Sequence, residues 1–137
     1  MNGLPWSFDE AERRLSAASS RQQSAEEELK RAYREAAEAE DRYRVRLALL
    51  ITELRDMGVP ATACLDLAKG ANDVAKLRRE RDIAEGVKVA AEQACWRRNA
   101  DRRDAARLCD WSQRREMAEA AGAVAHDFEK PVGAGVN

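Results

Sequence analysis

The chain has 137 residues, and alanine, glutamate, lysine, leucine and arginine account for 77 of them. This composition, with only 7 glycines and 3 prolines, is typical of long helices and coiled coils, and it excludes a β-sandwich, an α/β nucleotide-binding fold and a disulfide scaffold. The 24 basic residues nearly cancel the 25 acidic ones, which argues against a DNA mimic and a strongly basic nucleic-acid binder.

Residues 1–6 form a lead segment that has neither the basic region nor the apolar run of a signal peptide. The longest apolar run, residues 47–51, is far shorter than the roughly 20 residues that a transmembrane helix needs. The 3 cysteines lack Cys-x-x-Cys spacing and are expected to act as small buried hydrophobes in a reducing compartment. We therefore expect a cytoplasmic protein that does not contact membranes.

Residues 7–57 are predicted to form one long helix. Ser7 is a suitable N-cap, and Glu10 completes a capping box three residues later. Apolar residues recur every seven positions along two parallel seams, and many of them are alanine, which allows another helix to approach closely. The first seam comprises Phe8, Leu15, Gln22, Leu29, Ala36, Tyr43, Leu50 and Met57. The second comprises Ala11, Ala18, Ala25, Ala32 and Ala39, followed by Leu47 and Leu54.

Residues 58–71, the tip, are predicted to hold a loop and a short helix. Gly58 is expected to end the first helix in the left-handed conformation, and Pro60 bars its continuation. A two-turn helix then runs to Lys69 and is expected to end at Gly70, also with a positive φ. Gly58, Pro60 and Gly70 are therefore the candidate structural residues of the tip.

Residues 72–128 are predicted to form a second long helix, capped by Asn72 or Asp73. Residues 97–104 offer almost nothing apolar, so the helix there is loosely packed, kinked or engaged in charge pairs. The tail, residues 129–137, is expected to be disordered. An apolar stripe runs along Val74, Leu77, Ala84, Ala91 and Ala94.

Two long helices joined by a short connection predict an all-α fold in one domain, a long antiparallel two-helix coiled-coil hairpin with a short helix at its tip. Pairing about the tip places residue i roughly opposite residue 130 − i. The cluster Arg42–Arg46 would then lie opposite residues 83–88. The same register pairs Ala36 and Ala39 with Ala91, Ala94 and Cys95, Tyr33 with Trp96, and Trp6 with Val124 and Phe128.

The hairpin is expected to associate with itself, as a homodimer or higher oligomer, into a helical bundle. A seam rich in alanine buries little area, so a single hairpin is marginally stable. Several large apolar residues lie off the main seam and would cover a partner copy. They are Leu49, Ile51, Trp96 and Trp111.

The sequence does not predict an enzyme, and we expect no catalytic residue, cofactor or metal. The only histidine, His126, lies near the end of the last helix, 17 residues from Cys109, which is too far for a nucleophile and base on one helix. The pair Glu35 and Glu38 has the spacing of di-metal ligands but lacks the accompanying histidine. None of the common nucleotide-binding, hydrolase or zinc-protease motifs occurs in the sequence.

The tip is the candidate partner-binding site, because helix breakers give it a defined shape. The alternative for Thr62 and Asp66 is that they only cap or solvate the short helix. The alternative for the arginines is pairing with acids along the helix, as in Arg78–Asp82 and Arg81–Glu85. A helix-turn-helix across the tip is disfavoured because the flanking helices are long rods. The polar candidates for contact are Thr62, Asp66 and Lys69, with Arg44, Arg78, Arg79 and Arg81 beside them.

The pattern of breakers and helix positions around the tip resembles a family of small, mostly uncharacterised helical phage and prophage proteins. The resemblance covers residues 30–115 and includes no catalytic residues. It implies a phage origin, among early genes, and a non-catalytic accessory role, and we expect the protein to act in the cytoplasm of a bacterial host cell. The residues that carry it are Leu54–Thr62, Asp66–Gly70, Val74–Leu77 and Arg81–Glu85.

Two functional hypotheses follow from the tip and the resemblance. In the first, the protein binds and modulates a host macromolecule, such as a defence protein that it inhibits. In the second, it is an accessory factor of phage DNA recombination or replication that binds DNA or a DNA-binding protein. A protein complex would tolerate moderate salt, whereas the affinity for DNA would fall steeply with salt.

Overall fold

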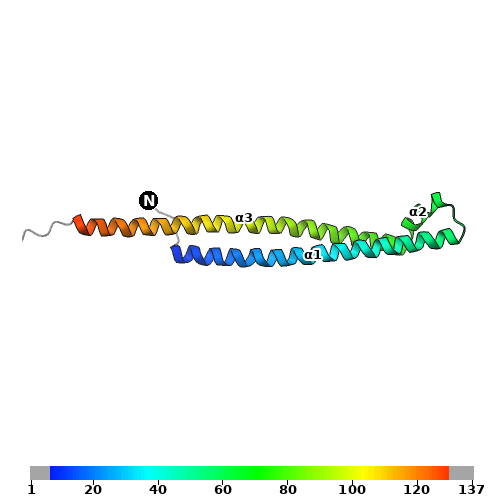
Figure 1. Ribbon diagram of the computed structural model, residues 1–137, viewed down its shortest axis with the longest axis horizontal. Coiled ribbons are helices and arrows are strands. Elements are labelled where there is room, and N and C mark those ends of the chain that lie inside the picture. Colours follow the sequence, from blue (N-terminus) through cyan, green and yellow to red (C-terminus); the bar gives the residue numbers. More distant parts are fainter. Residues whose placement is uncertain (1–6, 130–137) are drawn as a thin grey trace, which may run out of the picture. The chain divides into compact units, whose positions relative to one another are not determined.

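A computed structural model of the chain describes residues 7–129, with side chains as far as residue 123. These residues form three α-helices and no strand: α1 (Phe8–Asp56), α2 (Ala61–Gly70) and α3 (Asn72–Glu129). The helices α1 and α3 pack against each other, which confirms the all-α class (Figure 1). The predicted lead segment, most of the predicted tail and the predicted contact of Trp6 with Val124 and Phe128 lie outside the described residues and side chains.

The chain divides into two compact units, and α1 and α3 both run through each of them. Within the described residues, unit 1 holds residues 7–22 and 98–129, and unit 2 holds residues 23–97. The division falls at the strongly polar stretch that the sequence pattern singled out. Through that stretch α3 is continuous, Arg98 pairs with Asp101 at 3.7 Å, and the Asn99 side chain accepts a hydrogen bond from Gln22 at 3.3 Å.

The heptad seams predict the buried face of α1 correctly. Leu47 and Leu54 of the shifted seam are half-buried. Met57 does not belong to the buried face, because α1 ends at Asp56 and leaves its side chain exposed. The buried residues of α1 are Ala11, Ala18, Ala32, Ala36, Ala39 and Tyr43. The expected stripe on α3 is buried at Val74 and half-buried at Leu77, Ala84, Ala91 and Ala94.

The end of α1 in unit 2 is a Schellman motif. Gly58 has φ +85°, its N–H bonds to the Arg55 carbonyl at 2.9 Å, and the Val59 N–H bonds to the Leu54 carbonyl at 3.0 Å. The positive φ predicted for Gly58 is therefore confirmed. The prediction for Gly70 is wrong: it is the last residue of α2, and the chain turns at Ala71 with φ −67° and ψ 139°, which any L-residue adopts.

In unit 2, α1 and α3 are antiparallel, because successive partners rise along one helix and fall along the other. Tyr33 donates a hydrogen bond to Glu92, Glu40 pairs with Arg81 at 3.6 Å, and Arg46 pairs with Asp73 at 2.5 Å. The predicted register is wrong by between about one and three helical turns, and the shift is largest at Arg46. Tyr33 meets Glu92 and Lys88, while its predicted partner, Trp96, is 81% exposed.

The shift has a structural cause in the connection between the two long helices. From the end of α1, the chain turns back through α2 to the start of α3 (Figure 1). As a result, α3 begins opposite Arg46 and not opposite the end of α1. The predicted neighbours change accordingly: Tyr43 contacts Arg81, and Ala36 lines a groove with Arg81 and Lys88 and not with the alanines at 91 and 94.

Unit 1 is also antiparallel, since Phe8 bonds through its backbone N–H to Glu116 at 3.0 Å and Gln22 meets Asn99. The two helices differ in length, with 49 residues in α1 and 58 in α3, so α3 continues past the start of α1 (Figure 1). Ser112 is the buried polar residue of this unit.

Candidate functional site

The helix α2 presents one polar face to solvent. Thr62, Asp66 and Lys69 are all exposed, and their spacing of four and three residues places them on the same side of the helix. The opposite side holds the two buried residues, Cys64 and Ala68. The structure therefore brings together the three polar candidates from the tip. Among the described residues, none of the three has an ion pair or a side-chain hydrogen bond.

Helix capping does not explain these polar residues. The N-cap position of α2 is Pro60, with φ −58° and ψ 140°, and no side chain caps this end. Thr62 and Asp66 lie inside the helix and are too far along it to serve as its cap. The alternative that remains is simple solvation of the exposed face.

Two of the four candidate arginines are engaged within unit 2. Arg44 pairs with Glu40 at 2.5 Å. Arg81 pairs with Asp82 at 2.9 Å and lies over the ring of Tyr43, which is buried in the seam. Each of these two arginines has a carboxylate partner on its own chain, so it offers a partner molecule less uncompensated charge than an unpaired arginine.

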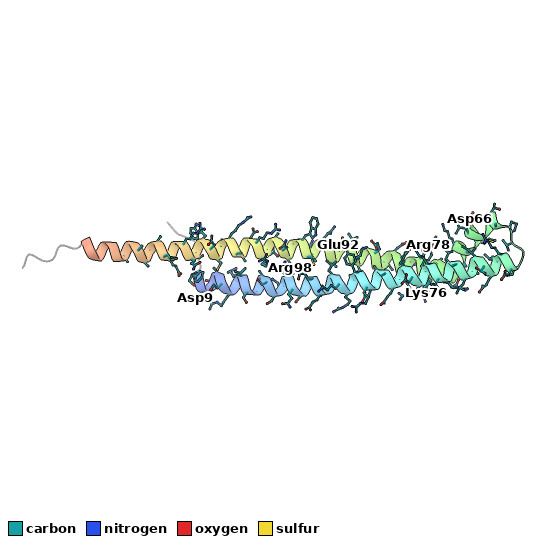
Figure 2. All side chains as sticks on the ribbon, viewed as in Figure 1. Asp9, Asp66, Lys76, Arg78, Glu92 and Arg98 are labelled. Carbon is teal, nitrogen blue, oxygen red and sulfur yellow. The ribbon has the colours of Figure 1, made fainter. Side chains whose placement is uncertain are left out.

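Arg78 and Arg79 are the two candidate arginines that stay exposed. The predicted pairs Arg78–Asp82 and Arg81–Glu85 do not form. Asp82 pairs with its neighbour Arg81, and Glu85 pairs with Lys88 at 2.8 Å. Figure 2 shows Arg78 projecting from α3 on the same edge of the view as Asp66 on α2, with Lys76 on the opposite edge.

A groove of about 420 Å³ lies between α1 and α3 in unit 2. Its alanines, Ala36 and Ala37, leave room between the helices, and its rim carries equal numbers of acidic and basic side chains. Glu40 and Lys88 belong to this rim and were not predicted as site residues. For Lys88, the sequence pattern that could have identified it is a heptad on α3. In this heptad Val74, Arg81, Lys88 and Cys95 lie seven residues apart, so two long basic side chains occupy the seam.

Contacts between α1 and α3 in unit 2 shift the pKa of two side chains in opposite directions. The hydrogen bond from Arg46 holds the pKa of the Asp73 carboxyl below its usual 3.8. The hydrogen bond to Glu92, together with the charge of that carboxylate, raises the pKa of the Tyr33 phenol above 10.0. Both effects favour the protonation states that tie α1 to α3 at neutral pH.

The described residues offer little for covalent or metal chemistry. All three cysteines are free, and burial raises the pKa of the Cys95 and Cys109 thiols, which lowers the fraction of reactive thiolate. Within the described part of the chain, no three metal-ligating side chains gather at one place. The three helices also contain no stretch long and apolar enough to cross a bilayer. His126 lies beyond the last described side chain.

No known family, characterised protein or solved structure matches this chain.

Proposed function

We propose that the protein is a non-catalytic helical phage protein that binds and modulates a macromolecule of its bacterial host, in the cytoplasm. In this proposal α1 and α3 form an antiparallel coiled-coil hairpin with α2 at its tip, and the hairpin associates with further copies into a bundle. The partner at the tip is a host protein, and inhibition of a defence protein is the role suggested by the phage resemblance.

One observation carries the proposal: the exposed face of α2 holds three polar side chains that make no ion pair or side-chain hydrogen bond within the described residues. Such side chains can bond to a partner without first breaking intramolecular contacts. The Schellman motif at Gly58 and the buried Cys64 and Ala68 hold this face on a defined backbone. A pre-ordered surface loses less entropy on binding than a flexible loop.

The second hypothesis, DNA binding, has less support. A DNA-binding surface needs several uncompensated basic side chains, because each neutralised phosphate contributes to affinity through released counterions. In unit 2, Arg44, Arg46 and Arg81 are each paired with carboxylates. Arg78 and Arg79 are the two arginines of the candidate site that keep an exposed, unpaired charge among the described residues.

The test compares two variants of the full chain that lose the same charges. The first changes Thr62, Asp66, Lys69 and Arg79 to alanine, and the second changes Ser20, Glu27, Lys30 and Arg34, which are exposed residues of α1. Both variants and the unchanged protein are immobilised and exposed to host lysate at low and high salt. Retained proteins are identified by mass spectrometry, and retained nucleic acid is measured after nuclease digestion.

We expect one host protein to be retained by the unchanged protein and by the α1 variant at both salt concentrations, and to be lost from the tip variant. Circular dichroism must show equal helix content for all three. Equal retention by both variants would remove the α2 face as the site. Retention of nucleic acid alone, with a steep loss at high salt, would replace the proposal by the DNA hypothesis.

A further inference from the structure

A second surface of unit 2 is apolar, and none of its lining residues belongs to α2. It is a shallow hollow of about 430 Å³ between α1 and α3, which we name the Val45 hollow. Its floor consists of Val45 and Leu49 from α1 and Leu77 from α3. Its rim is formed by Asp41, Arg42 and Arg46.

The apolar floor of the Val45 hollow faces solvent in the single chain. Val45 is 60% exposed and Leu49 is 55% exposed. The interior of the molecule is small by comparison: of the nine buried hydrophobic residues among those described, six are alanine. Because hydrophobic stabilisation scales with the apolar area removed from water, a protein with this interior gains substantially by covering the hollow.

The charges on the rim indicate what covers it. Arg46 is already paired with Asp73 and Glu53. Asp41 and Arg42 form no ion pair with any described residue, so the rim offers one free acid beside one free base. A strongly acidic or strongly basic partner satisfies only one of them. A copy related by a two-fold axis satisfies both, because Asp41 then meets the partner copy's Arg42 and Arg42 meets its Asp41.

We infer that the Val45 hollow is the surface through which two copies of this chain associate, with Val45 and Leu49 at the centre and reciprocal Asp41–Arg42 pairs at the edge. The inference rests on the self-association in the proposed function and adds the place where the copies meet.

The first experiment measures the mass of the full chain by sedimentation equilibrium over a range of concentrations. Leu49→Glu introduces a charge at the centre of the hollow. Leu67→Glu is the matched control, since Leu67 is 54% exposed but lies on α2 and does not line the hollow. We expect twice 15.3 kDa for the unchanged protein and for Leu67→Glu. For Leu49→Glu we expect the dissociation constant of the dimer to rise by at least about tenfold.

The second experiment tests the two-fold pairing directly. Asp41→Arg leaves two unpaired bases on each rim and Arg42→Asp leaves two unpaired acids, so each variant alone is expected to dimerise more weakly than the unchanged protein. An equimolar mixture of the two variants places two bases opposite two acids. We expect it to form a heterodimer with close to the original affinity, detected by light scattering and by native mass spectrometry.

The outcomes separate this inference from the proposed function. A dimer that persists in Leu49→Glu, or a mixture that does not recover affinity, would overturn the Val45 hollow as the interface while self-association stands. An unchanged protein that sediments at 15.3 kDa at all concentrations would overturn self-association as well. Circular dichroism on every variant checks that helix content is retained, and a variant with reduced helix is replaced by Leu49→Gln.

Discussion

The guanidinium of Arg81 lies over the ring of Tyr43, 4.5 Å from its centroid, at the centre of the seam in unit 2. Two turns along α3, Lys88 lies 5.0 Å from the ring of Tyr33 in the same way. Each basic side chain occupies a seam position of α3 and lies over an aromatic ring from α1. Cation–π contacts therefore help to set the register of the two helices in a seam that is otherwise mostly alanine.

The two tyrosines are expected to differ strongly in their contribution to stability. Tyr43 is 6% exposed, so Tyr43→Ala removes a buried ring and should lower the free energy of unfolding by about 3–5 kcal/mol. Tyr33 is 49% exposed, and Tyr33→Ala should cost about 1 kcal/mol. Thermal and urea unfolding followed by circular dichroism compare the two variants. Equal losses would mean that the rings are equally buried in solution.

A larger side chain in the alanine seam tests whether α1 and α3 are closely packed or only loosely associated. Ala39 is 2% exposed, and Ala39→Leu should destabilise the protein by about 1–3 kcal/mol because the larger side chain has no room between the helices. The control is Ala37→Leu, at an exposed position that borders the groove, where we expect little change. If both substitutions are neutral by urea unfolding, α1 and α3 are not closely packed at Ala39.

The glycines of the tip should respond differently to alanine. Gly58→Ala places a β-carbon at φ +85° and should cost about 1–2 kcal/mol through backbone strain alone, since no other atom lies within 4 Å of that position. Gly70 is helical with open space around it, so Gly70→Ala should stabilise by about 0.5 kcal/mol. The two melting temperatures should therefore move in opposite directions. A loss of stability in Gly70→Ala would contradict the helical conformation and the open surroundings of Gly70 in this structure.

Ser112 offers a substitution that should stabilise the protein. Its side chain is 3% exposed, and its hydroxyl oxygen has no hydrogen-bond partner within the described structure. Ser112→Ala removes a buried unsatisfied polar group and installs a better helix former, so we expect a gain of about 1 kcal/mol. The exposed Ser20 provides the control, since Ser20→Ala changes propensity without changing burial. A gain in Ser112→Ala no larger than in Ser20→Ala would show that the hydroxyl is hydrated.

Acid should weaken the link between Arg46 and Asp73. Because the ion pair lowers the pKa of Asp73 below 3.8, its contribution is present above the unfolded-state pKa and is lost as the pH falls through the folded-state pKa. Asp73→Asn should therefore lower the melting temperature at neutral pH, and the difference from the unchanged protein should shrink toward zero in acid. Asp66→Asn, which removes an unpaired carboxylate, should show no such trend. The midpoint for Asp73 can be measured by NMR.

The all-α class, the buried face of α1 and the Schellman turn at Gly58 were predictable from the sequence because each depends on local chemistry. Heptad spacing selects the face of a helix that is buried, and Gly58 followed by Pro60 requires the helix to end, whatever surrounds them. The polar face of α2 was predictable for the same reason, since its residues share one side of a short helix. The Val45 hollow was predictable only in part: the sequence pattern identified Leu49 as an apolar residue off the main seam, but it did not identify Val45 or Leu77 as such.

The register and the charge pairs depended on the tertiary structure. A seam of small residues repeated every seven positions fits its partner almost equally well after a shift of one turn, so the pattern alone does not select the pairing of Tyr33 with Glu92 and Lys88. That choice depends on how the chain turns back through α2, and on which carboxylate each arginine meets once α3 begins opposite Arg46. Local patterns therefore determine which residues are helical and buried, whereas contacts between distant residues decide which of them are neighbours.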